Sequence, residues 1–522
     1  MTSRSPLFIV CLFVLAACSA SVAAPERPKL EITTDVAFDP ASIPAYDGSH
    51  DEVYAYIDAN LGRHVENLQR WVEQRSISAQ DDGIDEMAEL VRGDLAALGF
   101  QEAEVVPTKG HPGVWGYYDA GAEKTLLVYL MYDVQPVEAN WSIEDPFAGE
   151  LVENERGTVL MARGATNQKG PERAFLNALE SILAVHDNLP VNIMVLAEGE
   201  EELGSMNYPE LVSKYEDRLR ETDAAFFPMN VQDADGLYQL NLGVKGILYF
   251  ELEAQGGEWG GPSKAEIHGS YKAIVDSPVW RLVQALATLT TPDGNTITVP
   301  GYYDDVRPPT EEEMRLINGI AERMDQQSLR ETFGVAEWID GLEGREAIVE
   351  MLYQPTLNIN GIWAGYTGEG GKTILPHKAT AKVDSRLPPN IDPDEALAKI
   401  RAHLDEQGFA DVKIRPMSGY PAAQTSVDSP IVRATLSVLN KYGEVESVAP
   451  RLAGSAPFYQ FTERLGLPLV FGGPGHGSGA HAPDEYMVIK PSPGSKVAGL
   501  EEIEKGYVDI LFALSRLNGQ GN

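Results

Sequence analysis

The sequence predicts an α/β fold, with a central mixed sheet, flanking helices and an inserted α+β domain. Two short, almost wholly apolar runs, 125–130 and 191–197, are typical of strands buried on both faces. Between them, 172–185 has apolar residues at helical spacing. Alternating buried strands and helices predict a sheet whose chemistry lies at the carboxyl ends of its strands.

The middle of the chain has a different pattern. The runs 247–254 and 379–385 alternate between apolar and polar residues, which indicates strands with one wet face. Helical patterns at 277–289 and 393–407 accompany them, and 411–415 is a short strand. We therefore predict an inserted α+β lid, which we place at 246–418.

The outer parts of the chain complete the α/β domain. The first strong helix covers 51–75, where apolar residues recur every three or four positions. The apolar run 467–471 predicts another buried strand, and the pattern at 499–517 predicts a helix. The catalytic-type domain is accordingly expected to comprise 51–245 and 419–522.

Composition excludes several functions. The 522 residues carry a formal net charge of −37, and such an acidic chain repels phosphate backbones, so nucleic acid is not an expected partner. The two cysteines, Cys11 and Cys18, both lie near the N-terminus. Neither an internal disulfide nor a cysteine-based zinc site is therefore expected in the folded part.

The N-terminus has the features of an export signal. Arg4 precedes an apolar run at 6–17, too short to span a bilayer, and the run ends in a Leu-Ala-Ala-Cys sequence that resembles a bacterial lipobox. Cleavage after a signal peptide of residues 1–17 would leave Cys18 as a lipid-anchored N-terminus, followed by a polar tether at 19–50. A plain signal cleaved near 22–24 is the alternative.

These features predict an exported protein of the bacterial cell envelope, in the periplasm or at the outer membrane. The lipid on Cys18 would be its only attachment to a membrane.

Four motifs follow the predicted strands or lie near the end of the chain. Tyr-Asp-Val-Gln-Pro occupies 132–136, and a glycine-containing turn lies at 163–170. Glu-Glu-Leu-Gly-Ser occupies 201–205, and a stretch rich in glycine and histidine covers 475–485. Carboxylates and histidines at neighbouring strand ends are the groups that bind metal ions and transfer protons.

Together these motifs resemble the zinc exopeptidases and amidohydrolases that include carnosinase, carboxypeptidase G, aminoacylase and succinyl-diaminopimelate desuccinylase. The similarity runs from about Leu68 to Leu514, and the carnosinase-like dipeptidase branch resembles the chain most. It implies a zinc-exopeptidase-like sheet with an inserted dimerisation domain. It also implies hydrolysis of an amide bond in a small peptide or N-acyl amino acid that has a free carboxylate.

The resemblance assigns roles at the strand ends. Glu201 matches the general base, and Glu202 matches a ligand of the first of two zinc ions. His481 matches the histidine of that zinc. Asp133 matches the aspartate that orients a histidine of the second zinc.

The inserted domain and its surroundings supply the other matches. His268 matches a histidine that reaches the partner subunit's site in the family, which implies a homodimer. Arg386 matches the arginine that grips the substrate carboxylate, a task suited to a planar guanidinium. Ser455 and Thr373 lie in further motifs of the family and are expected to bind substrate.

Three ligand positions depart from the family pattern. Met131 replaces a histidine, Asn167 the bridging aspartate, and Met229 a further aspartate. These three are the full protein set of the second zinc, and a neutral thioether is a poor zinc ligand. We therefore expect at most one divalent ion, zinc by preference, or none, with Glu202 and His481 as ligands and Asn167 as a weak one.

Three functions are compatible with this pattern. The first is a dipeptide or N-acyl-amino-acid hydrolase with a degenerate metal site. The second is a metal-independent enzyme with an altered reaction, in which Glu201 acts as acid or base. The third is a non-catalytic lipoprotein that binds peptides or amino-acid conjugates through Arg386. A retained general base favours an enzyme, and the first function ranks highest.

Simpler interpretations apply to other residues. Met131 and Met229 have the character of core residues, and His476 lies in a glycine-rich sequence typical of a flexible loop. The remaining histidines carry no motif and are predicted to lie at the surface: His50, His64, His111, His186, His377 and His403.

Overall fold

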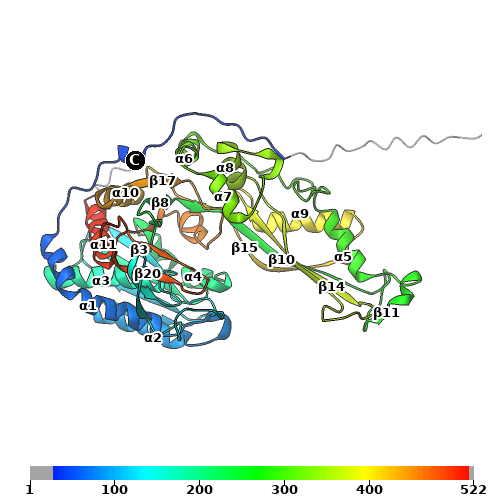
Figure 1. Ribbon diagram of the computed structural model, residues 1–522, viewed down its shortest axis with the longest axis horizontal. Helices are drawn as coiled ribbons and strands as arrows, with labels where there is room; N and C mark the ends of the chain where they lie inside the picture. Colours follow the sequence, from blue (N-terminus) through cyan, green and yellow to red (C-terminus); the bar gives the residue numbers. More distant parts are fainter. Residues whose placement is uncertain (1–26, 517–522) are drawn as a thin grey trace, which may run out of the picture.

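The computed structural model describes residues 27–516, and its larger lobe is built on a six-stranded sheet (Figure 1). The strand order is β1-β2-β6-β3-β7-β18. β3 is parallel to β6 and β7, whereas β2 is antiparallel to β1 and β6, so the sheet is mixed, as predicted. The strands are β1 (Glu102–Val106), β2 (Gly113–Tyr118), β3 (Thr125–Met131), β6 (Asn192–Glu198), β7 (Ala224–Pro228) and β18 (Leu469–Gly472).

Helices cover both faces of this sheet. On β3, Val128 and Leu130 face one hydrophobic core, and Leu127 and Tyr129 face another. The first core is shared with α1, α2, α3, α10 and α11, and the second with α4. The strand is apolar along its length because both faces are buried. The helices are α1 (Asp51–Glu73), α2 (Ile84–Ala97), α3 (Lys169–His186), α4 (Tyr208–Leu219), α10 (Pro430–Tyr442) and α11 (Leu500–Ser515).

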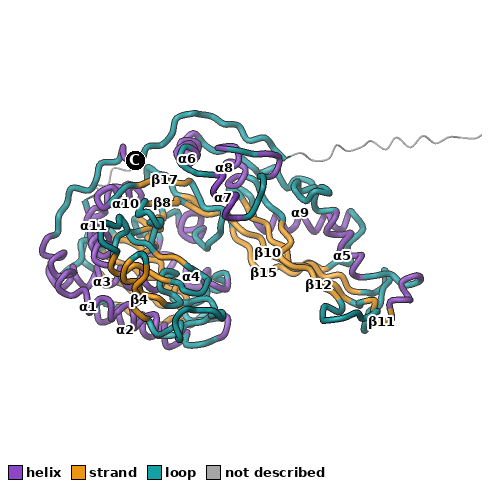
Figure 2. The backbone as a smooth tube through the Cα atoms, in the orientation of Figure 1, coloured by secondary structure: helices purple, strands orange, loops and turns teal. Residues whose placement is uncertain are grey.

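A second, four-stranded antiparallel sheet has the order β12-β14-β10-β15 (Figure 2). Leu248, Phe250 and Leu252 of β10 are buried against α5 and α9, and the residues between them are more exposed. The expected alternation is confirmed, although the strand predicted at 411–415 begins at Lys413 and runs to Tyr420. The elements are β10 (Gly246–Gln255), α5 (Pro278–Ala287), β12 (Asn358–Ala364), β14 (Lys378–Leu387), α9 (Pro393–Glu406) and β15 (Lys413–Tyr420).

Three further helices lie beside the junction of the two sheets, at the top of Figure 1. They are α6 (Glu311–Ala321), α7 (Gln326–Phe333) and α8 (Gly344–Tyr353). Met314 and Ile317 of α6 pack against Ile348 and Leu352 of α8 in a small core of their own. This unit forms a wall next to Arg386, which lies in β14.

The remaining strands form small sheets. One has the order β19-β20-β5-β4 and supports the loop that contains Asn167. The others are two-stranded: β8 with β17, β9 with β16, and β11 with β13. Their bounds are β4 (Glu150–Asn154), β5 (Gly157–Met161), β8 (Tyr238–Asn241), β9 (Gly243–Val244), β11 (Ile267–His268), β13 (Ile374–Leu375), β16 (Ala423–Gln424), β17 (Val445–Ala449), β19 (Gly477–Ser478) and β20 (Tyr486–Pro491).

The N-terminal segment 27–50 crosses the molecule from the α6–α8 unit to α1 (Figure 1). The Asn318 side chain donates to the Thr34 carbonyl at 2.9 Å, and that of Asn440 donates to the Ile43 carbonyl at 2.8 Å. This part of the predicted tether is therefore packed against the body. The predicted signal peptide and Cys18 lie outside the described residues, within which no helix is long and apolar enough to cross a membrane.

Four histidines differ from their predicted environment. The His50 side chain is 9% exposed and stacks on Phe512, with 3.9 Å between the ring centroids. His64 is fully buried, with Nδ1 2.6 Å from Oε2 of Glu504. His403 is buried beside the Thr288 carbonyl at 2.7 Å. His476 does not belong to a loose loop, because its ring nitrogens contact the Gln232 carbonyl and the Tyr486 hydroxyl. In each case a partner distant in the sequence allows a polar ring to be buried.

Candidate active site

The site begins where β3 and β6 end side by side. These strands are parallel, and Met131 pairs with Glu198, so the segments that follow leave the sheet at the same edge. Asp133 is fully buried there, and its two carboxylate oxygens accept the backbone N–H groups of Glu201 and Glu202, each at 3.1 Å. Asp133 therefore fixes the turn that contains the predicted base and the predicted metal ligand.

Glu202 is the centre of a hydrogen-bonded cluster. Its Oε1 accepts from Nδ2 of Asn167 at 2.7 Å and lies 3.2 Å from Nε2 of His481. Its Oε2 accepts from Nε2 of Gln135 at 2.8 Å, and Asn167 Nδ2 lies 3.0 Å from His481 Nε2. The structure thus brings the three predicted metal ligands together. Gln135, a neutral hydrogen-bond donor in the motif at 132–136, has a place in this cluster that the sequence alone did not indicate.

The loop that carries Asn167 is held by a second buried carboxylate. Glu485 accepts backbone N–H groups of Gly164, Thr166 and Asn167 at 3.1, 3.0 and 2.9 Å. It also forms a buried ion pair with Arg163 at 2.8 Å. Because Glu485 follows His481 by four residues, one short segment positions both the histidine and the loop opposite it. The motif at 475–485 contains Glu485, but the sequence alone did not indicate this function.

The two methionines occupy neighbouring strand ends. Val128 of β3 pairs with Phe226 of β7, and the same register continued beyond the strands places Met131 beside Met229. Met131 is 3% exposed, and both side chains pack in the core that contains Tyr129 and Phe227. Their expected character as core residues is confirmed. Two thioethers and one amide supply no charge to balance a dication, so the second zinc set does not fit zinc.

The carboxyl groups at this edge repel one another. Burial, together with the Glu202 carboxylate, raises the pKa of Asp133 to about 7 and that of Glu201 well above its usual range. Burial raises the pKa of Glu198 to about 8, although Glu198 accepts from the hydroxyl groups of Tyr129 and Ser205. The hydrogen bond with Glu202 raises the pKa of His481. The site therefore stabilises positive charge, whether carried by a proton or by a metal ion.

The predicted first metal position contains two groups of the kinds that bind zinc. Glu202 and His481 are adjacent, and a carboxylate with an imidazole is a suitable part of a zinc site. A catalytic zinc usually has three protein ligands, and Asn167 directs its Nδ2 donor, not an acceptor, at Glu202. Within residues 27–516, no group of three or more His, Cys, Asp or Glu side chains could hold a metal ion.

The predicted substrate-binding residues fall into two places. Arg386 donates from Nη1 to the Ser455 hydroxyl at 2.9 Å, and Ser455 donates to the Gly246 carbonyl at 3.0 Å. Thr373 does not join them. It lies beside His268 at the end of the lid, where the Gly269 N–H donates to the Thr373 carbonyl at 3.2 Å.

His268 is exposed at that far end, with Nδ1 2.7 Å from the Ser270 hydroxyl. Figure 1 shows β11, which ends at His268, at the tip of the lid and far from β3. Within one chain, His268 and Thr373 are therefore separate from the cluster around Glu202.

Comparison with known proteins identifies the family of the chain. The model of the family described as Peptidase family M20/M25/M40 matches residues 129–492. The Cys-Gly metallodipeptidase dug1 of Schizosaccharomyces pombe is 29% identical over 375 residues, which cover 68% of this chain and 75% of the relative. The human Beta-Ala-His dipeptidase is 29% identical over 379 residues, which cover 68% of this chain and 71% of that protein.

Solved structures share the fold. The M20 family metallo-carboxypeptidase Sso-CP2 of Sulfolobus solfataricus superimposes with a TM-score of 0.78 at 34% identity, covering 87% of this chain and 99% of that one. Human carnosine dipeptidase 1 superimposes with a TM-score of 0.70 at 24% identity, and the match covers 90% of this chain and 100% of the dipeptidase chain. The resemblance, the fold class and the enzyme class inferred from the sequence, a peptide-bond hydrolase, are thereby confirmed. The chain belongs to Peptidase family M20/M25/M40.

Proposed function

We propose that the chain hydrolyses the amide bond of a dipeptide or N-acyl amino acid and uses at most one divalent metal ion. The observation that carries this proposal is the Glu201–Glu202 turn, which Asp133 holds at the sheet edge beside His481. A bare binding protein has no need of a buried carboxylate dedicated to orienting two others. The names of the relatives, Cys-Gly and Beta-Ala-His dipeptidases, support a small substrate.

Substrate orientation is assigned to Arg386. Its guanidinium offers a planar, charged donor group to a carboxylate, and Ser455 orients that group at 2.9 Å. Tyr420 lies within electrostatic reach of both ends of the site. Burial and the Glu201 carboxylate raise the pKa of Tyr420, whereas Arg386 lowers it. A substrate anchored at Arg386 would accordingly extend past Tyr420 toward Glu201.

Proton transfer is assigned to Glu201. Its carboxylate takes a proton from the attacking water and gives it to the departing amine. Asp133 does not touch the reacting atoms in this scheme but positions the turn. Glu202 and His481 would hold the single ion, which when bound polarises the substrate carbonyl and lowers the pKa of water.

One observation favours a metal-independent enzyme as the second candidate. The amide of Asn167 contacts both Glu202 and His481, so a neutral group already connects the two ligands. In that alternative, Glu201 acts as acid or base in a changed reaction. Burial raises the pKa of Glu201, which favours its protonated form and so suits the acid role.

We also propose a homodimer formed through the lid, because His268 and Thr373 are separated from the site within one chain. The edge strand β12 exposes apolar side chains, with Ile359, Ile362 and Trp363 at 49%, 51% and 45%. An exposed apolar edge strand has unpaired backbone groups that can form hydrogen bonds with a strand of a second chain. A two-fold arrangement could carry His268 of each chain toward the other chain's Glu201.

Export and lipid anchoring at Cys18, which would place the protein in the bacterial cell envelope, also belong to the proposal. Their support is the signal-like sequence before Ser19.

The first prediction concerns the base. Replacing Glu201 by Gln keeps the shape of the side chain and removes its basicity, so turnover of a susceptible dipeptide should fall by about 10²–10⁴-fold. Glu210→Gln, on the exposed side of α4, is the matched control and should leave turnover unchanged. Steady-state kinetics measures both variants. Equal turnover in wild-type and Glu201→Gln protein would contradict the assignment.

The second prediction concerns the dimer. His268→Ala and Glu201→Gln proteins should each be nearly inactive, and mixing them under subunit exchange should restore part of the activity. A mixed dimer contains one site with an intact Glu201 and an intact His268 from the other chain. Each variant mixed with itself is the control. A monomer with full wild-type activity, found by sedimentation analysis at assay concentration, would refute the arrangement.

The third prediction concerns metal content. After dialysis, the unmodified protein should retain at most one zinc per chain by elemental analysis. Combining Met131→His, Asn167→Asp and Met229→Asp should raise the content toward two, because together these changes supply the missing charge and imidazole. Met131→His alone should not. Two equivalents retained by the unmodified protein would show that the ligand positions are misassigned.

A further inference from the structure

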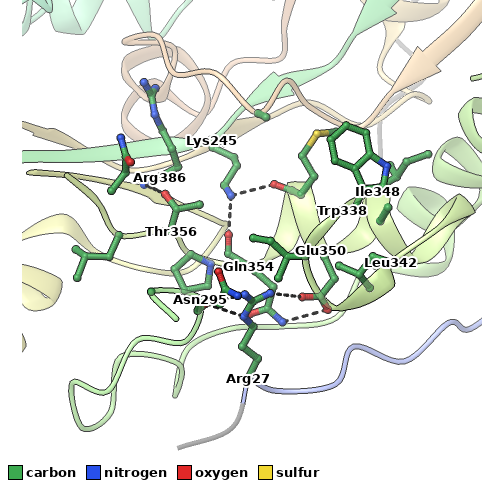
Figure 3. A pocket seen from close by; sticks show the side chains of 18 of the residues that line it. Arg27, Lys245, Asn295, Trp338, Leu342, Ile348, Glu350, Gln354, Thr356 and Arg386 are labelled. Carbon is green, nitrogen blue, oxygen red and sulfur yellow. Dashed lines mark hydrogen bonds and ion pairs between the residues drawn. The ribbon is translucent and has the colours of Figure 1, made fainter. Parts of the chain in front are cut away.

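A separate cavity of about 540 Å³ lies between the α6–α8 unit and the end of the lid sheet (Figure 3). Its walls are mostly apolar and include Leu329 of α7, Ile348 of α8, and Trp338 and Leu342 from the segment between these helices. This size and lining are typical of pockets that bury a small ligand. Its lining contains no residue of the Glu201–Glu202 turn.

A buried cation faces this cavity. Lys245 is 1% exposed, and its Nζ donates to the backbone carbonyls of Met351 at 3.1 Å and Gln354 at 2.6 Å (Figure 3). In the part of the chain that the structure describes, no carboxylate lies within ion-pair distance of Lys245. An ammonium group has three donors, so one remains for a ligand.

The charge on Lys245 is not balanced by its surroundings. Burial lowers the pKa of Lys245 to about 7, and the nearby guanidinium groups of Arg451 and Arg386 add to the effect. An anion placed here would relieve both the desolvation and the mutual repulsion. Arg386 lines the cavity and is shared with the proposed substrate site, where its Nη1 donates to Ser455, a residue outside the cavity lining.

The cavity also contains an unused acceptor. Gln354 is 5% exposed, and its Nε2 donates to the Pro28 carbonyl at 2.8 Å, which fixes the orientation of the amide. The Oε1 atom of Gln354 is buried without a hydrogen-bond partner. Such an atom is costly unless a donor reaches it. A ligand with an N–H group would supply that donor.

The N-terminal segment closes one side. Arg27 donates from Nε and Nη2 to the Asn295 carbonyl at 2.9 and 2.7 Å, and its Nη1 lies 3.7 Å from Glu350 (Figure 3). Arg27 and Glu350 therefore compensate each other. Arg386, which also lines the cavity, has Nε 3.3 Å from Oδ2 of Asp384. Among the lining residues that the structure describes, Lys245 is therefore the cation without a nearby carboxylate, which selects a ligand with a single negative group.

We propose that this cavity is a binding site for an amphipathic monocarboxylate with an amide N–H, of the N-acyl amino acid class. The carboxylate binds Lys245, the amide N–H donates to Oε1 of Gln354, and the acyl chain lies along Trp338 and Leu342. The site is distinct from the catalytic edge of the sheet. The proposal does not depend on hydrolysis, since binding at this site requires neither Glu201 nor a metal ion.

Isothermal titration of the purified, chelator-treated protein with N-octanoylglycine tests the site, because removal of the metal ion suppresses hydrolysis of the probe and the proposed binding needs no metal. Wild-type protein should bind the acid, and the methyl ester of the probe should bind on the order of ten-fold more weakly or worse, because a charge-assisted hydrogen bond is lost. Lys245→Met should weaken binding of the acid by a similar factor. Met351→Trp, which fills the cavity from a partly exposed wall position, should also reduce it.

N-octanoylglycine also belongs to the proposed substrate class, so a second binding event at the catalytic edge is expected. His481→Ala is the control, because it changes that edge and should leave unaltered the binding event that Lys245→Met and Met351→Trp remove. Loss of binding in His481→Ala with full binding in Met351→Trp would place the probe in the active site and overturn the proposal. No binding to wild-type protein, or equal affinity for acid and ester, would overturn it as well. If Lys245→Met fails to fold by circular dichroism, Met351→Trp and the ester still decide the outcome.

Discussion

The parallel register between β3 and β6 is the constraint on which the rest of the site depends. Pairing of Met131 with Glu198 brings the next residues of both strands to one edge, where Asp133 can accept the N–H groups of Glu201 and Glu202. A shift of one residue would turn these side chains to the other face of the sheet. The two apolar cores on either side of β3 oppose such a shift, so the hydrophobic packing of the large lobe sets the geometry of the carboxylates.

The central strands, and the polar residues that follow them, could be predicted because both depend on the order of neighbouring residues in the sequence. The apolar runs 125–130 and 191–197 correspond to β3 and β6, and the residues after them form the cluster. The burial of His64 could not be predicted in this way, because its partner Glu504 is 440 positions away and contributes nothing to the local pattern. The role of Glu485 could not be predicted for a related reason, since its carboxylate accepts hydrogen bonds from backbone N–H groups of a loop that is distant in the sequence.

The α6–α8 unit shows another limit of sequence patterns. Its helices are short, and they bury their apolar faces mainly against one another. Periodicity over so few turns is weak, and the shared core becomes visible only when the helices are placed together. The cavity beside Lys245 arises from this packing, so no single sequence motif predicts it. Thr373 was likewise matched to the substrate site by its motif, whereas the fold places it beside His268.

The three proposed replacements of ligand residues, at positions 131, 167 and 229, leave the architecture of the edge in place. The thioethers of Met131 and Met229 fill space in the core. The Asn167 amide connects Glu202 with His481 at the position where the family pattern has an aspartate that bridges two metal ions. A protonated His481 would instead donate to Glu202, so the same cluster can balance its charge by a proton or by one metal ion. The carboxylate Asp133 and the turn that it holds remain in place in both cases.

Hydrolysis of a panel of dipeptides and N-acyl amino acids, measured as zinc is added stepwise to chelator-treated protein, tests both the activity and the number of metal ions. We expect cleavage of at least one compound, with a rate that reaches its maximum at or below one zinc per chain. Absence of hydrolysis at every zinc concentration would contradict the proposed activity. A rate that continues to rise until two zinc ions are bound per chain would contradict the proposed single-metal site.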